Sequence, residues 1–128
     1  MDTNRQFEQI IATCRDLFAK KLKDYGAAWR IMRPTSVTDQ IFIKANRIRS
    51  IETKGETMVD EGIRSEFIGI VNYGIIALIQ LELGYAEADD MSPEVALAKY
   101  DENETKALPP TKAKTHDHDE AWRRTRIR

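Results

Sequence analysis

Both tryptophans of this 128-residue chain stand in copies of one short motif. Residues 21–33 and 114–126 agree at six positions, at a constant offset of 93 residues. The first copy gathers one acid, two aromatic rings and two guanidinium groups: Asp24, Tyr25, Trp29, Arg30 and Arg33. Arginine forks bind phosphate bidentately, and an aromatic face can stack on a base. The set therefore suits a nucleotide. The competing structural interpretation is that Trp29 closes the end of a helical bundle while Asp24 pairs with Arg30 or Arg33.

A second group of candidate residues is acidic and lies where two predicted helices meet. Carboxylates from adjacent helices can hold Mg²⁺ together with the phosphates of a substrate. The candidate metal ligands are Glu52, Glu61 and Glu66. Helical nucleotide pyrophosphohydrolases use Glu-x-x-Glu and Glu-x-x-Asp pairs, and the two predicted helices carry neither spacing. The competing interpretation is an ordinary solvated turn. In the metal-binding interpretation, the cofactor is Mg²⁺.

Asn72 and Tyr73 form a third candidate pair, inside the most apolar segment of the chain. A buried amide must find hydrogen-bond partners, so Asn72 could bridge two helices or contact a base or a metal-bound water. Lys44 is a further candidate phosphate ligand, close in sequence to Arg47. The sequence shows no P-loop, no dinucleotide-binding glycine pattern and no Cys/His zinc spacing.

Composition and charge narrow the function classes. Apolar residues make up 41% of the chain, charged residues 32%, and the net charge is −1. A neutral chain lacks the basic footprint of a protein that binds duplex nucleic acid. The N-terminus carries no apolar signal segment, and polar residues interrupt the apolar stretch over residues 67–83, which is short for a membrane span. We therefore expect a cytoplasmic protein that does not cross a membrane.

The spacing of apolar residues predicts helices only, and hence an all-α bundle of about three core helices plus a fourth. The expected segments are a helix over 5–22, a short turn over 27–32, and helices over 36–54, 64–83 and 93–108. A reciprocal cap between Ser36 and Asp39 is expected to open the second helix, and Ser92 with Pro93 the fourth. The helix over 64–83 is apolar on nearly every side, which is typical of a buried central helix. Gly69 and Gly74 within it predict close approach by a neighbouring helix or a ligand.

The repeat divides the chain into two units of unequal length. Residues 1–84 are expected to form one complete helical unit, residues 85–92 an acidic linker, and residues 93–128 part of a second unit. The prolines at 109 and 110 fall where the matching helix of the first unit continues, and proline breaks a helix interior. We therefore expect residues 109–128 to be poorly ordered.

Residues 23–41, with Lys44, Glu52, Glu61 and Asn72-Tyr73, resemble the nucleotide modification associated domain 1 family, which is common in Bacteroidetes and occurs in phages. The resemblance implies an association with enzymes that modify nucleotides, and no established reaction. It implies the same ligand-binding residues as above: Asp24, Tyr25, Trp29, Arg30, Arg33, Lys44, Asn72 and Tyr73. Bacterial members of this family consist of two units, so the resemblance also implies a chain truncated in its second repeat.

Two functions of different class follow from the sequence. The first is a helical domain that binds, and in one version processes, a nucleotide or modified nucleotide. The second is a non-enzymatic module whose exposed helical faces pair with another protein chain, or a decayed fragment of a two-repeat protein. A homo-oligomer is compatible with either function.

Overall fold

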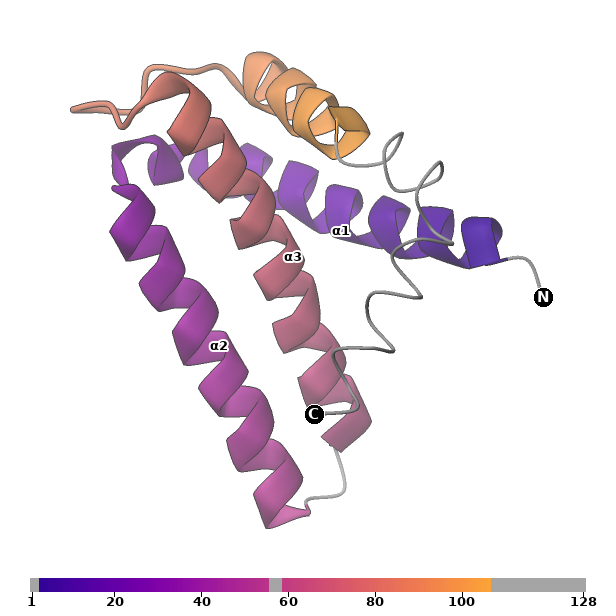
Figure 1. Cartoon of the computed structure of the whole chain (residues 1–128). Helices are drawn as coiled ribbons and strands as arrows, with labels where there is room; N and C mark the ends of the chain where they lie inside the picture. The colour runs from indigo at the N-terminus through magenta and orange to yellow at the C-terminus, as the bar shows by residue number, and fades with distance from the viewer. Residues whose placement is uncertain (1–2, 56–58, 107–128) are drawn as a thin grey trace, which may run out of the picture.

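The structure, a computed structural model, describes residues 3–55 and 59–106, and all of their side chains except those of residues 59–61. It consists of helices joined by short turns (Figure 1). The elements in chain order are α1 (Thr3–Tyr25), the 3-10 turn η1 (Ala28–Ile31), α2 (Pro34–Lys54), α3 (Val59–Leu83) and a helix over residues 93–106. The described ranges contain no strand, and the predicted all-α fold is confirmed.

Glycine residues end three of the helices, as their places in the sequence predict. Gly26, Gly55 and Gly84 have φ angles of 68°, 61° and 75°, a left-handed conformation that a side chain disfavours. The amide of Gly26 donates to the carbonyl of Leu22 at 2.8 Å, and that of Gly55 to Ile51 at 3.2 Å. These bonds satisfy carbonyl groups that the helix ends leave without a helical partner.

The predicted start of α2 is wrong. The helix begins at Pro34 with Arg33 as the preceding cap residue, and no side chain caps this end. Ser36 lies inside the first turn, where its amide donates to the carbonyl of Arg33 at 2.9 Å. Proline favours the first helical position because its φ angle is already helical and that position needs no amide donor. This preference overrides the capping pattern that Ser36 and Asp39 suggest.

Helix α3 packs between α2, on one side, and α1, which crosses behind it (Figure 1). Its buried residues lie toward these neighbours: Asn72, Ile75, Ile76, Ile79 and Gln80. The helix is long and apolar enough over Gly62–Leu83 to cross a membrane by length and composition, a test that the core helix of a soluble protein also passes. Only 28% of the window that meets this test is buried in the structure. The expectation of a central helix buried on nearly every side is therefore wrong. The side of α3 that faces neither α1 nor α2 is largely exposed.

The helix over residues 93–106 docks on the first unit, against both α1 and α3. The amide of Val95 donates to Ser92 Oγ at 3.2 Å, which confirms the predicted cap. Tyr100 is fully buried, with its ring 4.5 Å from that of Phe18 on α1. Arg15 of α1 donates two hydrogen bonds to the carboxylate of Asp101, at 2.7 and 2.9 Å. The second motif copy and the tail over 109–128 lie outside the described residues.

We expect Tyr100→Phe to lower the stability of the fold without changing its shape. The hydroxyl of Tyr100 donates to Asn72 Oδ1 at 2.8 Å, and both side chains are buried. Its loss leaves a buried acceptor short of a partner, which costs about 1–3 kcal/mol. Thermal denaturation followed by circular dichroism should show a Tm lower by about 4–8 °C for each kcal/mol. Tyr85→Phe is the matched control, because Tyr85 is 51% exposed; equal losses in the two variants would contradict the role of the bond.

Candidate functional site

The first copy of the repeated motif forms the turn between α1 and α2. Asp24 and Tyr25 end α1, and Gly26 turns the chain into η1, which carries Trp29 and Arg30. Asp89, from the segment after α3, clamps this turn, because the amide of Ala27 donates to its Oδ2 atom at 3.0 Å. A Cβ atom at Gly26 would lie 2.8 Å from the same oxygen. The glycine is therefore required both by its φ angle and by the approach of Asp89.

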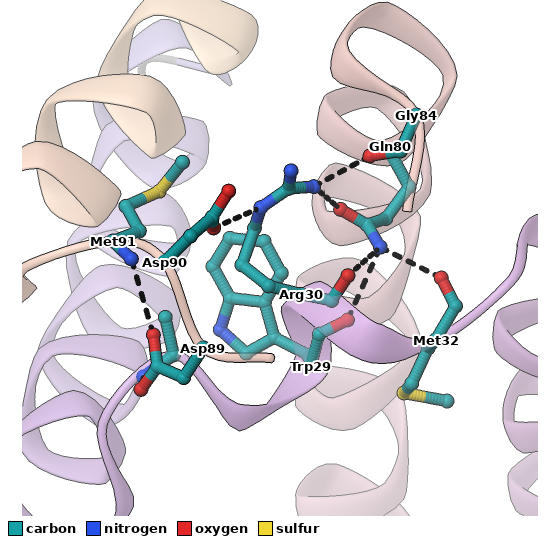
Figure 2. A network of polar contacts seen from close by, with 9 residues as sticks. Trp29, Arg30, Met32, Gln80, Gly84, Asp89, Asp90 and Met91 are labelled. Carbon is teal, nitrogen blue, oxygen red and sulfur yellow. Dashed lines mark hydrogen bonds and ion pairs between the residues drawn. The ribbon is translucent and has the colours of Figure 1, made fainter. Parts of the chain in front are cut away.

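Arg30 is buried, with 4% of its surface exposed, and its guanidinium binds groups within the protein (Figure 2). Its Nε atom donates to Asp90 Oδ1 at 3.0 Å. Its Nη1 atom donates to Gln80 Oε1 and, at 2.7 Å, to the carbonyl of Gly84 at the end of α3. A cation at a helix C-terminus also interacts favourably with the helix dipole. Arg30 thus ties η1 to the end of α3.

Gln80 completes this network from inside α3 (Figure 2). Its Nε2 atom faces three carbonyl oxygens of the η1 turn, those of Trp29, Arg30 and Met32, at 3.2, 2.9 and 2.7 Å. Gln80 is only 1% exposed, so these bonds supply the partners that a buried amide needs. The hydrogen bond from Arg30 lowers the pKa of the Asp90 carboxyl below its usual value. The ion pair at the edge of the network is therefore charged at neutral pH.

A cavity of about 310 Å³ opens between α1, η1 and α3. Four aromatic residues line it: Phe18, Tyr25, Trp29 and Tyr73. Besides the tyrosines, Lys21 and Asn72 are its polar lining residues, while the other non-aromatic lining residues are apolar. Such a mixture of apolar walls and few polar groups is typical of a small-molecule site. Among the predicted ligand-binding residues, the cavity brings together Tyr25, Trp29, Asn72 and Tyr73.

Asn72 bridges helices at the wall of this cavity. Its Nδ2 atom donates to the carbonyl of Cys14 on α1 at 3.0 Å, and its Oδ1 atom accepts from Tyr100 at 2.8 Å. Burial raises the pKa of the Tyr100 hydroxyl, which therefore remains a donor at neutral pH. An amide has two donors and two acceptor lone pairs. Among the described residues, one donor and one lone pair of Asn72 are thus left after its two structural bonds.

Lys44 reaches from α2 across α3 to the edge of the cavity. Its stem crosses α3 at Gly69, where a Cβ atom would lie 2.7 Å from Lys44 Cε. The close approach predicted for Gly69 is therefore confirmed, and the neighbour is a side chain. The Lys44 ammonium lies 3.5 Å from Glu66 Oε2 and 5.8 Å from the centroid of the Tyr73 ring. Gly69 and Tyr73 both line the cavity, so this cation lies beside it.

The remaining motif residues lie away from the cavity lining. Asp24 is exposed and, within the described residues, no ion pair joins it to Arg30 or Arg33. The guanidinium of Arg33 lies over the ring of Tyr85, 4.9 Å from its centroid. The predicted pairing of Asp24 is thus replaced by two other contacts: Arg30 with Asp90, and Arg33 with Tyr85.

The three candidate metal ligands show no shared site. Glu52 is exposed near the end of α2, and the side chain of Glu61 lies outside the described residues. Glu66 is occupied by cations, with Lys44 at 3.5 Å and Arg47 at 3.6 Å from its carboxylate oxygens. In the part of the chain that the structure describes, no group of three acidic, histidine or cysteine side chains could hold a metal ion.

Sequence reasoning missed the residues that fix the site. Gln80 is buried in the same apolar helix as Asn72, and the rule that buried amides need partners applies equally to both. Asp89 and Asp90 were part of the expected acidic linker, yet one clamps Ala27 and the other pairs with Arg30. An acidic segment directly after an apolar helix was the available signal for these contacts.

We expect the two arginines of the motif to differ sharply in their effect on stability. Arg30→Met removes charge-assisted bonds and leaves Gln80 Oε1 and the Gly84 carbonyl without that donor, so the loss should exceed about 2 kcal/mol. Arg33→Met loses an exposed cation–π contact, which is worth about 0.5–1 kcal/mol. Urea titration of both purified variants measures this difference. Similar unfolding free energies for the two variants would contradict a structural role specific to Arg30.

Comparison with known proteins gives one family match, over the middle of the chain. No curated protein and no solved structure gives a significant match to this chain. Residues 21–81 match the family model described as nucleotide modification associated domain 1. The matched segment begins at the motif and ends just after Gln80, so it includes every cavity residue on η1 and α3. Residues 21–81 of this chain are thus similar to the nucleotide modification associated domain 1 family.

Proposed function

We propose that this domain binds a nucleotide or nucleotide-like small molecule in the cavity between α1, η1 and α3. The observation that carries the proposal is that four residues predicted from the sequence as ligand contacts line one cavity from three elements. Tyr25 comes from α1, Trp29 from η1, and Asn72 with Tyr73 from α3.

The size and lining of the cavity fit a base. Its volume of about 310 Å³ falls at the lower end of the range for small-molecule sites, roughly 300–1,000 Å³. Tyr25 is 74% exposed, and its ring at the edge of the cavity can cover a base that enters. Stacking of a base on an aromatic side chain is worth about 1–3 kcal/mol. The unused donor and lone pair of Asn72 would supply polar contacts to the edge of the base.

We propose that lysine side chains supply the positive charge that binds a phosphate group of the ligand. Lys21 lines the cavity, and Lys44 lies beside Gly69 and Tyr73. Arg30 and Arg33, the sequence-based candidates, are engaged by Asp90 and Tyr85 instead. We therefore assign the phosphate to Lys21 first, with Lys44 as a second cation that would have to leave Glu66. The proposal concerns binding, and it assigns no metal and no catalytic step.

We expect Tyr25→Ala to weaken binding of base-containing ligands while leaving the fold intact. Because Tyr25 is largely exposed, its truncation removes little packing, whereas a lost stacking contact costs about 1–3 kcal/mol of binding. The measurement is a thermal-shift screen of nucleosides and their mono-, di- and triphosphates, followed by calorimetry. A ligand at 100 times its Kd stabilises the folded state by about 2.7 kcal/mol.

Tyr85→Ala is the matched control for this variant. Tyr85 is also an exposed tyrosine, at 51%, and it does not line the cavity. If the Tyr25→Ala and Tyr85→Ala variants bind the ligand with equal affinity, binding in the cavity is contradicted. A folded sample that no nucleoside or nucleotide stabilises would contradict the proposed function altogether.

A lysine substitution tests the phosphate assignment separately. We expect Lys21→Met to reduce the affinity for a nucleoside monophosphate, since a charge-assisted hydrogen bond is worth about 1.5–3 kcal/mol. The affinity for the parent nucleoside should change little. Lys20→Met serves as the control, because Lys20 is exposed and does not line the cavity. Parallel losses for nucleoside and monophosphate would place the phosphate elsewhere.

A further inference from the structure

Among the described residues, helix α3 has neighbours on two of its three sides. Lys44 of α2 packs over Gly69 and Tyr73, and Asn72 faces α1 and Tyr100. The third side, which we call the outer stripe, is apolar along its length: Phe67, Ile70, Gly74, Leu78 and Leu81. Phe67 is 53% exposed, Leu78 44% and Leu81 68%. No charged residue lies between Glu66 and Glu82, so the outer stripe presents about 22 Å of uncharged helix to the outside.

We propose that a second copy of this chain covers the outer stripe, with the two α3 helices antiparallel and crossing at Gly74. This inference goes beyond ligand binding and uses the side of α3 opposite the cavity. A glycine inside a helix costs about 1 kcal/mol relative to alanine. Nothing within the described chain requires it at position 74, because a Cβ atom there would meet no atom within 4 Å. A helix that crosses at this point would require it.

The outer stripe is complementary to itself about Gly74. Phe67 and Leu81 lie seven residues before and after it, and Ile70 and Leu78 lie four residues before and after it. A two-fold axis through an antiparallel crossing places each residue opposite its counterpart at the same distance. Phe67 would then face the partner's Leu81, and Ile70 the partner's Leu78. Large side chains thus fill both ends of the contact while glycines meet at its centre.

The charges at the ends of the outer stripe match in the same arrangement. Arg64 and Glu82 are 18 residues apart, which is five full helical turns, so both lie on one flank of the outer stripe. The antiparallel crossing brings Arg64 of each copy close to the partner's Glu82. Arg64 is exposed beside α1 and forms no ion pair within the described chain. Glu82 is exposed as well, with Lys99 at 3.4 Å and Lys106 at 3.9 Å from its carboxylate. A parallel arrangement would instead place like charges together.

A second copy fits this face better than a lipid bilayer does. The outer stripe covers one side of α3 only, whereas a bilayer would also surround its neighbours. Charged side chains of the flanking helix lie next to the end of α3, where Lys99 and Lys106 contact Glu82. Their desolvation by lipid would be costly. A protein partner leaves these rim groups in water and buries the apolar centre, as interfaces commonly do.

The first experiment is sedimentation equilibrium of the whole chain over a range of concentrations. We expect a dimer whose dissociation constant rises at least about a hundredfold in Gly74→Glu and in Leu81→Glu, because each change acts in both copies and each copy loses about tenfold. Phe42→Glu is the matched control. Phe42 is a 65% exposed apolar residue on α2, outside the outer stripe, and its substitution should leave the dimer unchanged. Circular dichroism of the dilute variants checks that each monomer still folds.

A charge exchange tests the antiparallel register. Arg64→Glu and Glu82→Arg should each weaken the dimer, and the double variant should recover most of the loss, since it restores opposite charges at both ends. A chain that sediments as a monomer at all concentrations overturns the proposal, as does a dimer that Gly74→Glu leaves intact. Flotation of the chain with neutral phosphatidylcholine vesicles, lost in Leu81→Glu, would assign the outer stripe to lipid and overturn it too.

Discussion

The contact between Gln80 and Arg30 is the constraint on which the arrangement of this domain depends. Gln80 is a buried amide near the end of an apolar helix, and its burial is tolerable only because its donors and its acceptor are all used. The guanidinium of Arg30 must accordingly lie inside the protein. Once there, it also satisfies the Gly84 carbonyl and meets Asp90. Removal of any one member leaves buried polar groups without partners, so η1 has one position relative to α3.

This constraint explains how one short motif can serve two purposes. Arg30 points into the network, and because η1 is a single tight turn, the neighbouring residues Tyr25 and Trp29 are directed to the cavity. A second amide, Asn72, fixes the opposite wall by tying α3 to α1 and to the helix over residues 93–106. The cavity is therefore lined by residues whose backbone positions are set by buried hydrogen bonds. Such a site is largely formed before a ligand arrives, which reduces the entropic cost of binding.

The sequence predicted what depends on neighbouring residues and missed what depends on distant ones. Helix ends at Gly26, Gly55 and Gly84, and the cap at Ser92, were predictable because each is set within one turn of helix. The partners of Arg30 lie 50 and 60 residues away, at Gln80 and Asp90, and no local pattern encodes them. The first copy of the motif forms a single turn between α1 and α2. The division of its residues between structure and cavity required the three-dimensional arrangement.

Gly69 and Gly74 show why the environment of α3 has to be considered beyond a single chain. From the sequence the two are equivalent, since each weakens the same helix by about 1 kcal/mol and each predicts a close neighbour. Of the two, only Gly69 has one among the described residues, the stem of Lys44. Gly74 lies at the centre of an uncharged stripe, where the added Cβ atom of an alanine would meet no described atom within 4 Å. The described fold gives a reason for the first glycine, and the proposed second copy would give a reason for the second.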